Sequence, residues 1–215
     1  MTARRLAPLA AFLLAAALAA PAAFVIRNAP DQETDLASGV TTLPKGGTVE
    51  DAKRGYSITA GYIQLKEGDY LTARNATIRT RDAGEIRAAS VDYRAATDRL
   101  LATGPLSYSF EDLKGLKADR AAAYLSDNLI VATGNVAATD PQVSATAAVL
   151  DADKRQLVLF GPYSFQGKGV NQKSSKADAT LLVTLPKGSD KASWTTKVPT
   201  ADLTAYRKLV DSTKK

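Results

Sequence analysis

The stretch Ala118–Val136 decides the fold, because the chain repeats its pattern; it reads ADRAAAYLSDNLIVATGNV. Ala88–Leu106 and Ala145–Tyr163 follow the same order of small and apolar residues, a polar turn, and an apolar run that contains glycine. The three turns are Thr97-Asp98-Arg99, Ser126-Asp127-Asn128 and Asp153-Lys154-Arg155, and the three glycines are Gly104, Gly134 and Gly161. A more diverged copy, Tyr62–Ile78, precedes them and has Asn75 at the glycine position. Such self-similarity is typical of a stacked, repetitive architecture.

Apolar residues lie two and four positions before and after each glycine, so they share one parity. On a strand, residues of one parity face the same side of the sheet. The opposite parity mixes polar and apolar residues. This period of two favours strands over helices, and a glycine inside the run marks a sharp bend or a bulge. The sequence therefore predicts an all-β roll or sandwich of repeated, bent antiparallel strands.

The phrase Leu129–Val136, with Ala118-Asp119 upstream and Asp151–Leu159 downstream, resembles the OstA-like periplasmic family of lipopolysaccharide transport. That family includes a soluble bridge protein and a membrane-anchored component (LptA-like and LptC-like). The resemblance covers about residues 57–167 and departs from the family phrase where prolines follow Gly104 and Gly161. It implies a β-jellyroll, a half-open, V-shaped pair of sheets with an interior that accommodates acyl chains. It also implies end-to-end β-augmentation with partners of the same fold.

The candidate site consists of apolar residues of the common parity. They line a lipid groove if the two sheets splay open, and they fill a closed core if the sheets do not. Burial of each acyl methylene in such a groove contributes about 0.8 kcal/mol. The candidates are Leu100, Leu106, Tyr108, Ile130, Val136, Leu157, Leu159, Tyr163 and Phe165.

The N-terminal residues 1–26 are predicted to be a cleaved signal peptide or a retained inner-membrane anchor. Arg4 and Arg5 precede an apolar run, and the frames Ala17-Leu18-Ala19 and Ala20-Pro21-Ala22 resemble signal cleavage sites. The run is also long enough to span a bilayer core. Either interpretation places the remainder of the chain in the periplasm or cell envelope, with the cleaved signal favoured.

Three further segments complete the predicted organisation: a lead-in linker over residues 27–50, the β-jellyroll domain over 51–186, and a C-terminal loop and helix over 187–215. Gln166–Lys176 is predicted to be a loop and Ala179–Leu185 a last strand. Thr200–Lys214 has the pattern of a short amphipathic helix. This helix either packs on a mouth or edge of the sheet, or docks a partner or the membrane surface.

The composition argues against an enzyme. The 215 residues include no cysteine and no histidine, which excludes Cys/His zinc sites, a Cys nucleophile and a His base. Asp151 and Asp153 lie at a predicted turn, where Asp is common. The formal net charge of +6 is too small, and the basic residues too dispersed, for nucleic-acid binding. We expect no cofactor, no metal and no nucleic acid.

The sequence as a whole predicts an exported envelope protein that carries or bridges lipopolysaccharide or a similar amphipathic glycolipid across the periplasm. Its other expected partners are transport components of the same fold. The alternative is a structural envelope protein that assembles through sheet-edge pairing and carries no lipid.

Overall fold

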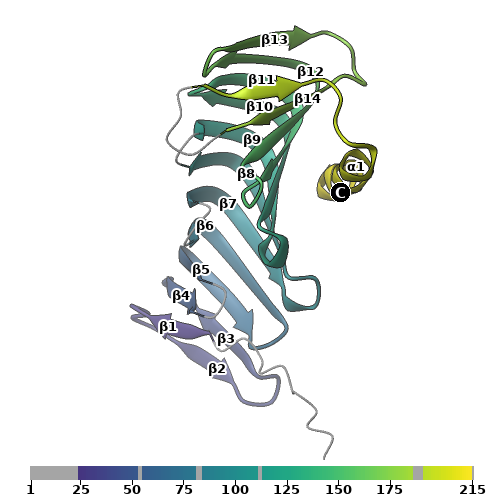
Figure 1. Cartoon of the computed structure of the whole chain (residues 1–215). Helices are drawn as coiled ribbons and strands as arrows, with labels where there is room; N and C mark the ends of the chain where they lie inside the picture. Colours follow the sequence, from purple (N-terminus) through teal and green to yellow (C-terminus); the bar gives the residue numbers. More distant parts are fainter. Residues whose placement is uncertain (1–23, 53–54, 81–83, 111–112, 186–190, 215) are drawn as a thin grey trace, which may run out of the picture.

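The computed structural model describes residues 24–52, 55–80, 84–110, 113–185 and 191–214. They form one 15-stranded antiparallel sheet, one α-helix and two short 3-10 helices, Ala95–Thr97 and Leu125–Asp127 (Figure 1). From β4 (Gly47–Asp51) to β12 (Gln156–Gly167), each strand pairs with its neighbour in sequence, in an up-and-down meander. The prediction of an all-β fold of repeated, bent antiparallel strands with a short C-terminal helix is confirmed.

Eight long strands make up most of the sheet: β5 (Tyr56–Lys66), β6 (Tyr70–Thr80), β7 (Gly84–Arg94), β8 (Arg99–Phe110), β9 (Leu113–Tyr124), β10 (Leu129–Thr139), β11 (Gln142–Asp151) and β12 (Gln156–Gly167). The N-terminal end is built from β1 (Val25–Arg27), β2 (Glu33–Asp35), β3 (Val40–Leu43) and β4 (Gly47–Asp51). The C-terminal end consists of β13 (Val170–Ser174), β14 (Thr180–Thr184) and β15 (Ser193–Thr195), followed by α1 (Thr200–Lys214).

The long strands carry an irregularity at mid-length, at the glycine positions of the repeat. In β8, Thr103 and Leu106 lie opposite Arg120 and Ala118 of β9, so β8 contains one more residue than its neighbour. Equivalent register shifts follow Thr133 in β10 and Phe160 in β12. An extra residue bends a strand and increases its twist. The diverged copy differs: Asn75 has a positive φ of 52°, but β5 and β6 stay in step on both sides of it.

The main core lies on one face of the sheet and joins both halves of the bent strands. It includes Ile58 and Ile78 from β5 and β6, Leu100 from β8, and Leu159 and Phe165 from β12. The row closest to the bends consists mostly of small residues. It runs across the sheet through Ala73, Val91, Ala102, Ala121, Ala132, Ala148 and Leu159. Small side chains allow the two halves to approach one another where the strands fold.

Helix α1 covers part of the opposite face of the sheet, in its C-terminal half (Figure 1). Tyr206 and Val210 pack with Val131, Val149 and Val158 in a second apolar cluster. The helix therefore lies on a sheet face, where it removes these strand residues from water.

Polar contacts fix the middle and the C-terminal end of this helix. The Tyr206 hydroxyl donates to Asp151 Oδ2 at 2.9 Å, and Lys154 Nζ lies 3.3 Å from the same carboxylate. Burial, together with the hydrogen bond to Asp151, raises the pKa of Tyr206, so its hydroxyl stays protonated at neutral pH. At the C-terminal end, Arg99 donates to the Ser212 carbonyl at 3.1 Å, which satisfies a carbonyl that the helix itself leaves open.

Several segments differ from their predicted structure. The expected linker over residues 27–50 contributes to β1 and contains β2, β3 and most of β4. Phe24 and Ile26, placed in the signal or anchor, pack against the core. Part of the predicted loop Gln166–Lys176 is β13, which pairs with β12. The strands β1–β4 and β13 are short and mostly polar, so an alternation with a period of two cannot be recognised in their sequences.

The remainder of the predicted N-terminal segment, residues 1–23 with both cleavage frames, lies outside the described residues. Within the described ranges, no helix has the length and hydrophobicity needed to cross a membrane.

The bend at Gly134 is open to a direct test. Gly134 has a φ of +74°, and an added Cβ would lie 2.9 Å from the Cβ of Asp119. Gly169 has a similar φ of +76°, and an added Cβ there would have no atom of the described residues within 4 Å. We expect Gly169→Ala to lower the free energy of unfolding by about 1–2 kcal/mol, the cost of the left-handed backbone. Gly134→Ala should lose about 1–3 kcal/mol more through the clash.

Urea unfolding followed by circular dichroism measures both variants. Equal losses for the two variants would mean that Asp119 moves aside freely and that the bend is not tightly packed.

Candidate functional site

The nine candidate residues lie together on the inner face of the sheet. All belong to the main core cluster, and none is more than 6% exposed. They come from alternate strands: Leu100, Leu106 and Tyr108 from β8, Ile130 and Val136 from β10, and Leu157, Leu159, Tyr163 and Phe165 from β12. Each of these strands has one extra residue at its bulge. Because of it, every second residue faces the interior both before and after the bend, without a change from even to odd positions.

The intervening strands β9 and β11 also contribute inner-face residues, which were not among the predicted candidates. Ala123 of β9 lies between Leu100 and Ile130, and Ala118 lies beside Leu106. Large residues on β8 and β10 therefore alternate with alanines on β9. A signal for these positions was present, because each repeat begins with small and apolar residues. Alanine alone does not distinguish a core position from a surface one.

The two halves of the strands form opposing walls of the interior. A small cavity of about 40 Å³ lies between Tyr56, Ile78 and Ile86 on one wall and Leu100 and Ile130 on the other. This volume is close to that of one water molecule in the liquid, about 30 Å³. At this place the two walls are therefore packed closely against one another by their own side chains.

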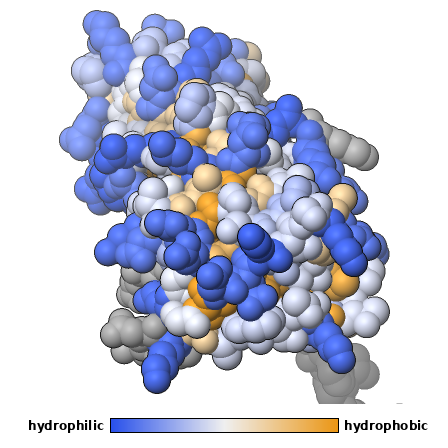
Figure 2. Space-filling model, turned by 90° about the horizontal axis from the view of Figure 1, so that it is seen from above, coloured by the Kyte–Doolittle hydropathy of each residue, from blue (hydrophilic) through white to orange (hydrophobic). Residues whose placement is uncertain are grey.

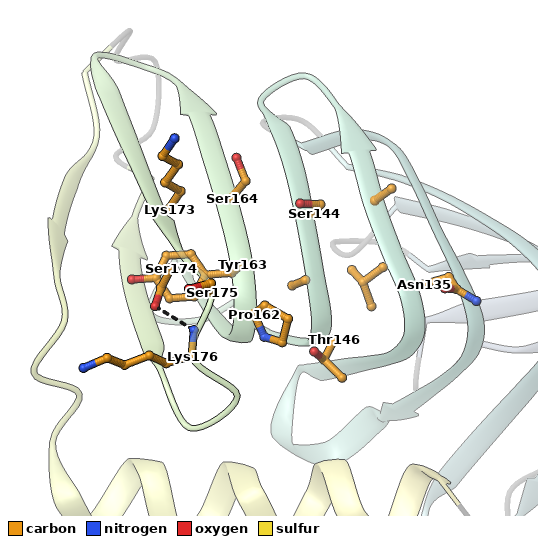
Figure 3. Close-up of a pocket in the computed structure, with 13 residues that line it drawn as sticks. Asn135, Ser144, Thr146, Pro162, Tyr163, Ser164, Lys173, Ser174, Ser175 and Lys176 are labelled. Atoms are coloured by element: carbon orange, nitrogen blue, oxygen red, sulfur yellow. Dashed lines mark hydrogen bonds between the residues drawn. The ribbon is translucent and has the colours of Figure 1, made fainter.

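A wider groove, of about 1110 Å³, lies over β10, β11 and β12 and the connection from β13 to β14 (Figure 3). Two of the candidates, Val136 and Tyr163, contribute to its lining, as do Lys173 and Lys176. Five hydroxyl residues also line it: Ser144, Thr146, Ser164, Ser174 and Ser175. None of the described residues that line the groove carries a carboxylate.

The groove therefore combines an apolar part with positive charge and hydroxyl groups. Thr146 already donates to the Gly161 carbonyl at 2.8 Å, whereas Ser144 and Ser164 are exposed. Lysine ammonium groups and hydroxyls bind phosphate or carboxylate oxygens through charge-assisted hydrogen bonds. Burial raises the pKa of Tyr163, so its phenol is neutral beside these lysines. This arrangement is suited to an amphipathic anion.

Apolar surface is also visible at the end of the molecule. Seen from above, apolar side chains form a band between hydrophilic borders (Figure 2). On the edge strand β15, Trp194 is 45% exposed, and its cross-strand neighbour Val183 belongs to the main core. The inner face thus reaches the edge of the sheet, where it ends in a partly exposed aromatic ring.

These features define an open, all-β protein with bent antiparallel strands, an apolar inner face and a C-terminal helix. No family model matches the chain, and no curated protein matches it. Among solved structures, it is similar to LptH of Pseudomonas aeruginosa, described as the LptA-homologous periplasmic component of the conserved lipopolysaccharide transport device. The TM-score is 0.47 and the identity 14%, over 52% of this chain and 82% of that one.

The packing of the interior can be tested on β12. Leu159 is fully buried on the inner face, and Ser164 on the same strand is exposed. We expect Leu159→Ala to lower the free energy of unfolding by about 2–5 kcal/mol, through lost burial and the cavity it leaves. Ser164→Ala, as the matched control, should change it by less than about 0.5 kcal/mol. Chemical denaturation measures both, and a loss below about 1 kcal/mol for Leu159→Ala would contradict the tight packing.

Proposed function

We propose that this protein is an exported envelope component that carries or bridges an amphipathic glycolipid, lipopolysaccharide or a similar lipid, across the periplasm. One observation carries the proposal. The groove over β10–β12 places the interior residues Val136 and Tyr163 in one lining with Lys173 and Lys176. An apolar interior that meets an uncompensated positive rim is complementary to a lipid with acyl chains and an anionic head.

The acyl chains are assigned to the space between the two walls. Both walls belong to the same strands, and the ladder hydrogen bonds run between neighbouring strands rather than from wall to wall. The interior can therefore open if the strands straighten at their mid-strand bulges, and the hydrogen bonds between neighbouring strands stay intact. Burial of acyl methylenes, at about 0.8 kcal/mol each, offsets the wall-to-wall packing that opening disrupts. No chemical step is involved, so the proposed role is not enzymatic.

The head group is assigned to the groove of Figure 3. Among the described residues, neither Lys173 nor Lys176 forms an ion pair. Their charges are therefore free to neutralise phosphate or carboxylate groups, while the serine and threonine hydroxyls along the strands bind sugar hydroxyls. Exposed lysines bind weakly enough to release the cargo, as a carrier requires.

The unpaired edges of the sheet favour the proposal that partners of the same fold bind there. Within the described part of the chain, β15 pairs with β14 alone, and β13 pairs with β12 alone. Such edges present backbone donors and acceptors to a strand of another chain. The same edges would serve a structural envelope protein that carries no lipid, so lipid binding distinguishes the two functions.

Native mass spectrometry of the protein purified from its envelope, with lipid extraction of the same sample, tests the proposal. Co-purified lipid in stoichiometric amount supports the carrier and identifies the cargo. A lipid-free chain that forms a ladder of oligomers supports the edge-pairing scaffold instead. The intact mass also shows whether the N-terminal segment is removed.

The lysines can be tested with a charge-reversal pair. We expect Lys173→Glu with Lys176→Glu to weaken binding of an anionic lysophospholipid at least tenfold, since about 1.4 kcal/mol corresponds to a factor of ten. The effect should shrink at high salt because these charges are exposed. Isothermal titration calorimetry on the full chain measures both affinities.

Lys66→Glu with Lys117→Glu serves as the matched control, because both lysines are exposed and neither lines the groove. This pair carries the same change in net charge and should leave the affinity within about twofold of the wild type. Equal weakening by both pairs would show a general charge effect and would remove the assignment of the head group to the groove.

A further inference from the structure

Tyr108 is an anomaly in the apolar interior. Its side chain is 4% exposed, and its hydroxyl is buried without a hydrogen-bond partner among the described residues. Its neighbours across the strands, Ile86 and Leu116, offer only apolar side chains. Two other buried tyrosines are satisfied: the Tyr93 hydroxyl donates to Asp98 at 3.1 Å, and that of Tyr206 donates to Asp151 at 2.9 Å.

Packing does not explain the hydroxyl. A buried hydroxyl without a partner opposes folding, because it loses its hydrogen bonds to water and gains none in return. Phenylalanine would fill the same space without this cost. Burial also raises the pKa of Tyr108 well above its usual range, so the group remains a neutral donor at physiological pH.

The position of Tyr108 links it to the space between the walls. Its cross-strand neighbour Ile86 borders the internal cavity, together with Leu100 and Ile130 of the opposite wall. A chain that enters between the walls at this cavity reaches the wall on which Tyr108 lies. Its hydroxyl is a buried donor on that wall, without a partner among the described residues, that can bind a polar atom of such a chain.

We propose that the Tyr108 hydroxyl is a binding determinant for acyl lipids and donates a hydrogen bond to the carbonyl oxygen of an ester or amide. The inference rests on the proposed lipid-carrying function and adds a preference within it. Acyl lipids are bound in preference to ether lipids of equal chain length, because the carbonyl oxygen of the acyl linkage is a stronger acceptor than an ether oxygen. The free protein tolerates the unsatisfied hydroxyl, and the bound lipid satisfies it.

The substitution Tyr108→Phe tests this inference, because it should stabilise the lipid-free protein and weaken the binding of acyl lipid. In the delipidated full chain we expect the Tm to rise by about 2–4 °C, because an unpaired group is removed. The probes are 1-acyl and 1-alkyl lysophosphatidic acid, which share a head group and differ at the carbonyl. The wild type should bind the acyl form about tenfold more tightly, and Tyr108→Phe should bind both forms equally.

Tyr93→Phe is the control, because its hydroxyl already has a partner in Asp98. It should lower the Tm and retain the tenfold preference. The inference is overturned if the wild type binds both probes equally, if Tyr108→Phe keeps the preference, or if its Tm falls. In those cases lipid is still bound and the carrier function stands. If the wild type binds neither probe, the carrier function and the inference fail together.

Discussion

The structure depends on one constraint: a single sheet must bury its own apolar face. A flat meander would expose that face along its whole length, and the one helix covers only part of the opposite side. The strands meet the constraint by folding at mid-length, so that the two halves of each strand become opposing walls. The row of small residues from Ala73 to Ala148 permits the close approach at the fold. The interior, the groove and the placement of Tyr108 all follow from this bend.

Much of this was predictable because the relevant signals are local. The alternation around Gly104, Gly134 and Gly161 predicted which residues share the inner face, and the apolar spacing within Thr200–Lys214 predicted the helix with the bounds that the structure shows. The short N-terminal strands were missed because three to five residues carry too little periodicity. They are held by pairing with one another and with the long strand β5.

The candidate site was predictable only in part. The inner-face residues followed from parity, but their burial between the walls depends on how far the walls close, which is a tertiary property. Lys173 and Lys176 lie in a segment predicted to be a loop, and they reach the groove because β13 folds back along β12. The unpaired state of the Tyr108 hydroxyl depends on every neighbour across the walls, so no local pattern could reveal it.

The connectivity of the long strands has a consequence for how such a molecule changes in evolution. From β5 to β12 each strand contacts mainly the strands before and after it in sequence, as in solenoid proteins, where stability is a sum over neighbouring units. Insertion or loss of one two-stranded unit would lengthen or shorten the sheet and leave its cross-section unchanged. The span of the protein is therefore adjustable by duplication, independently of what its cross-section accommodates.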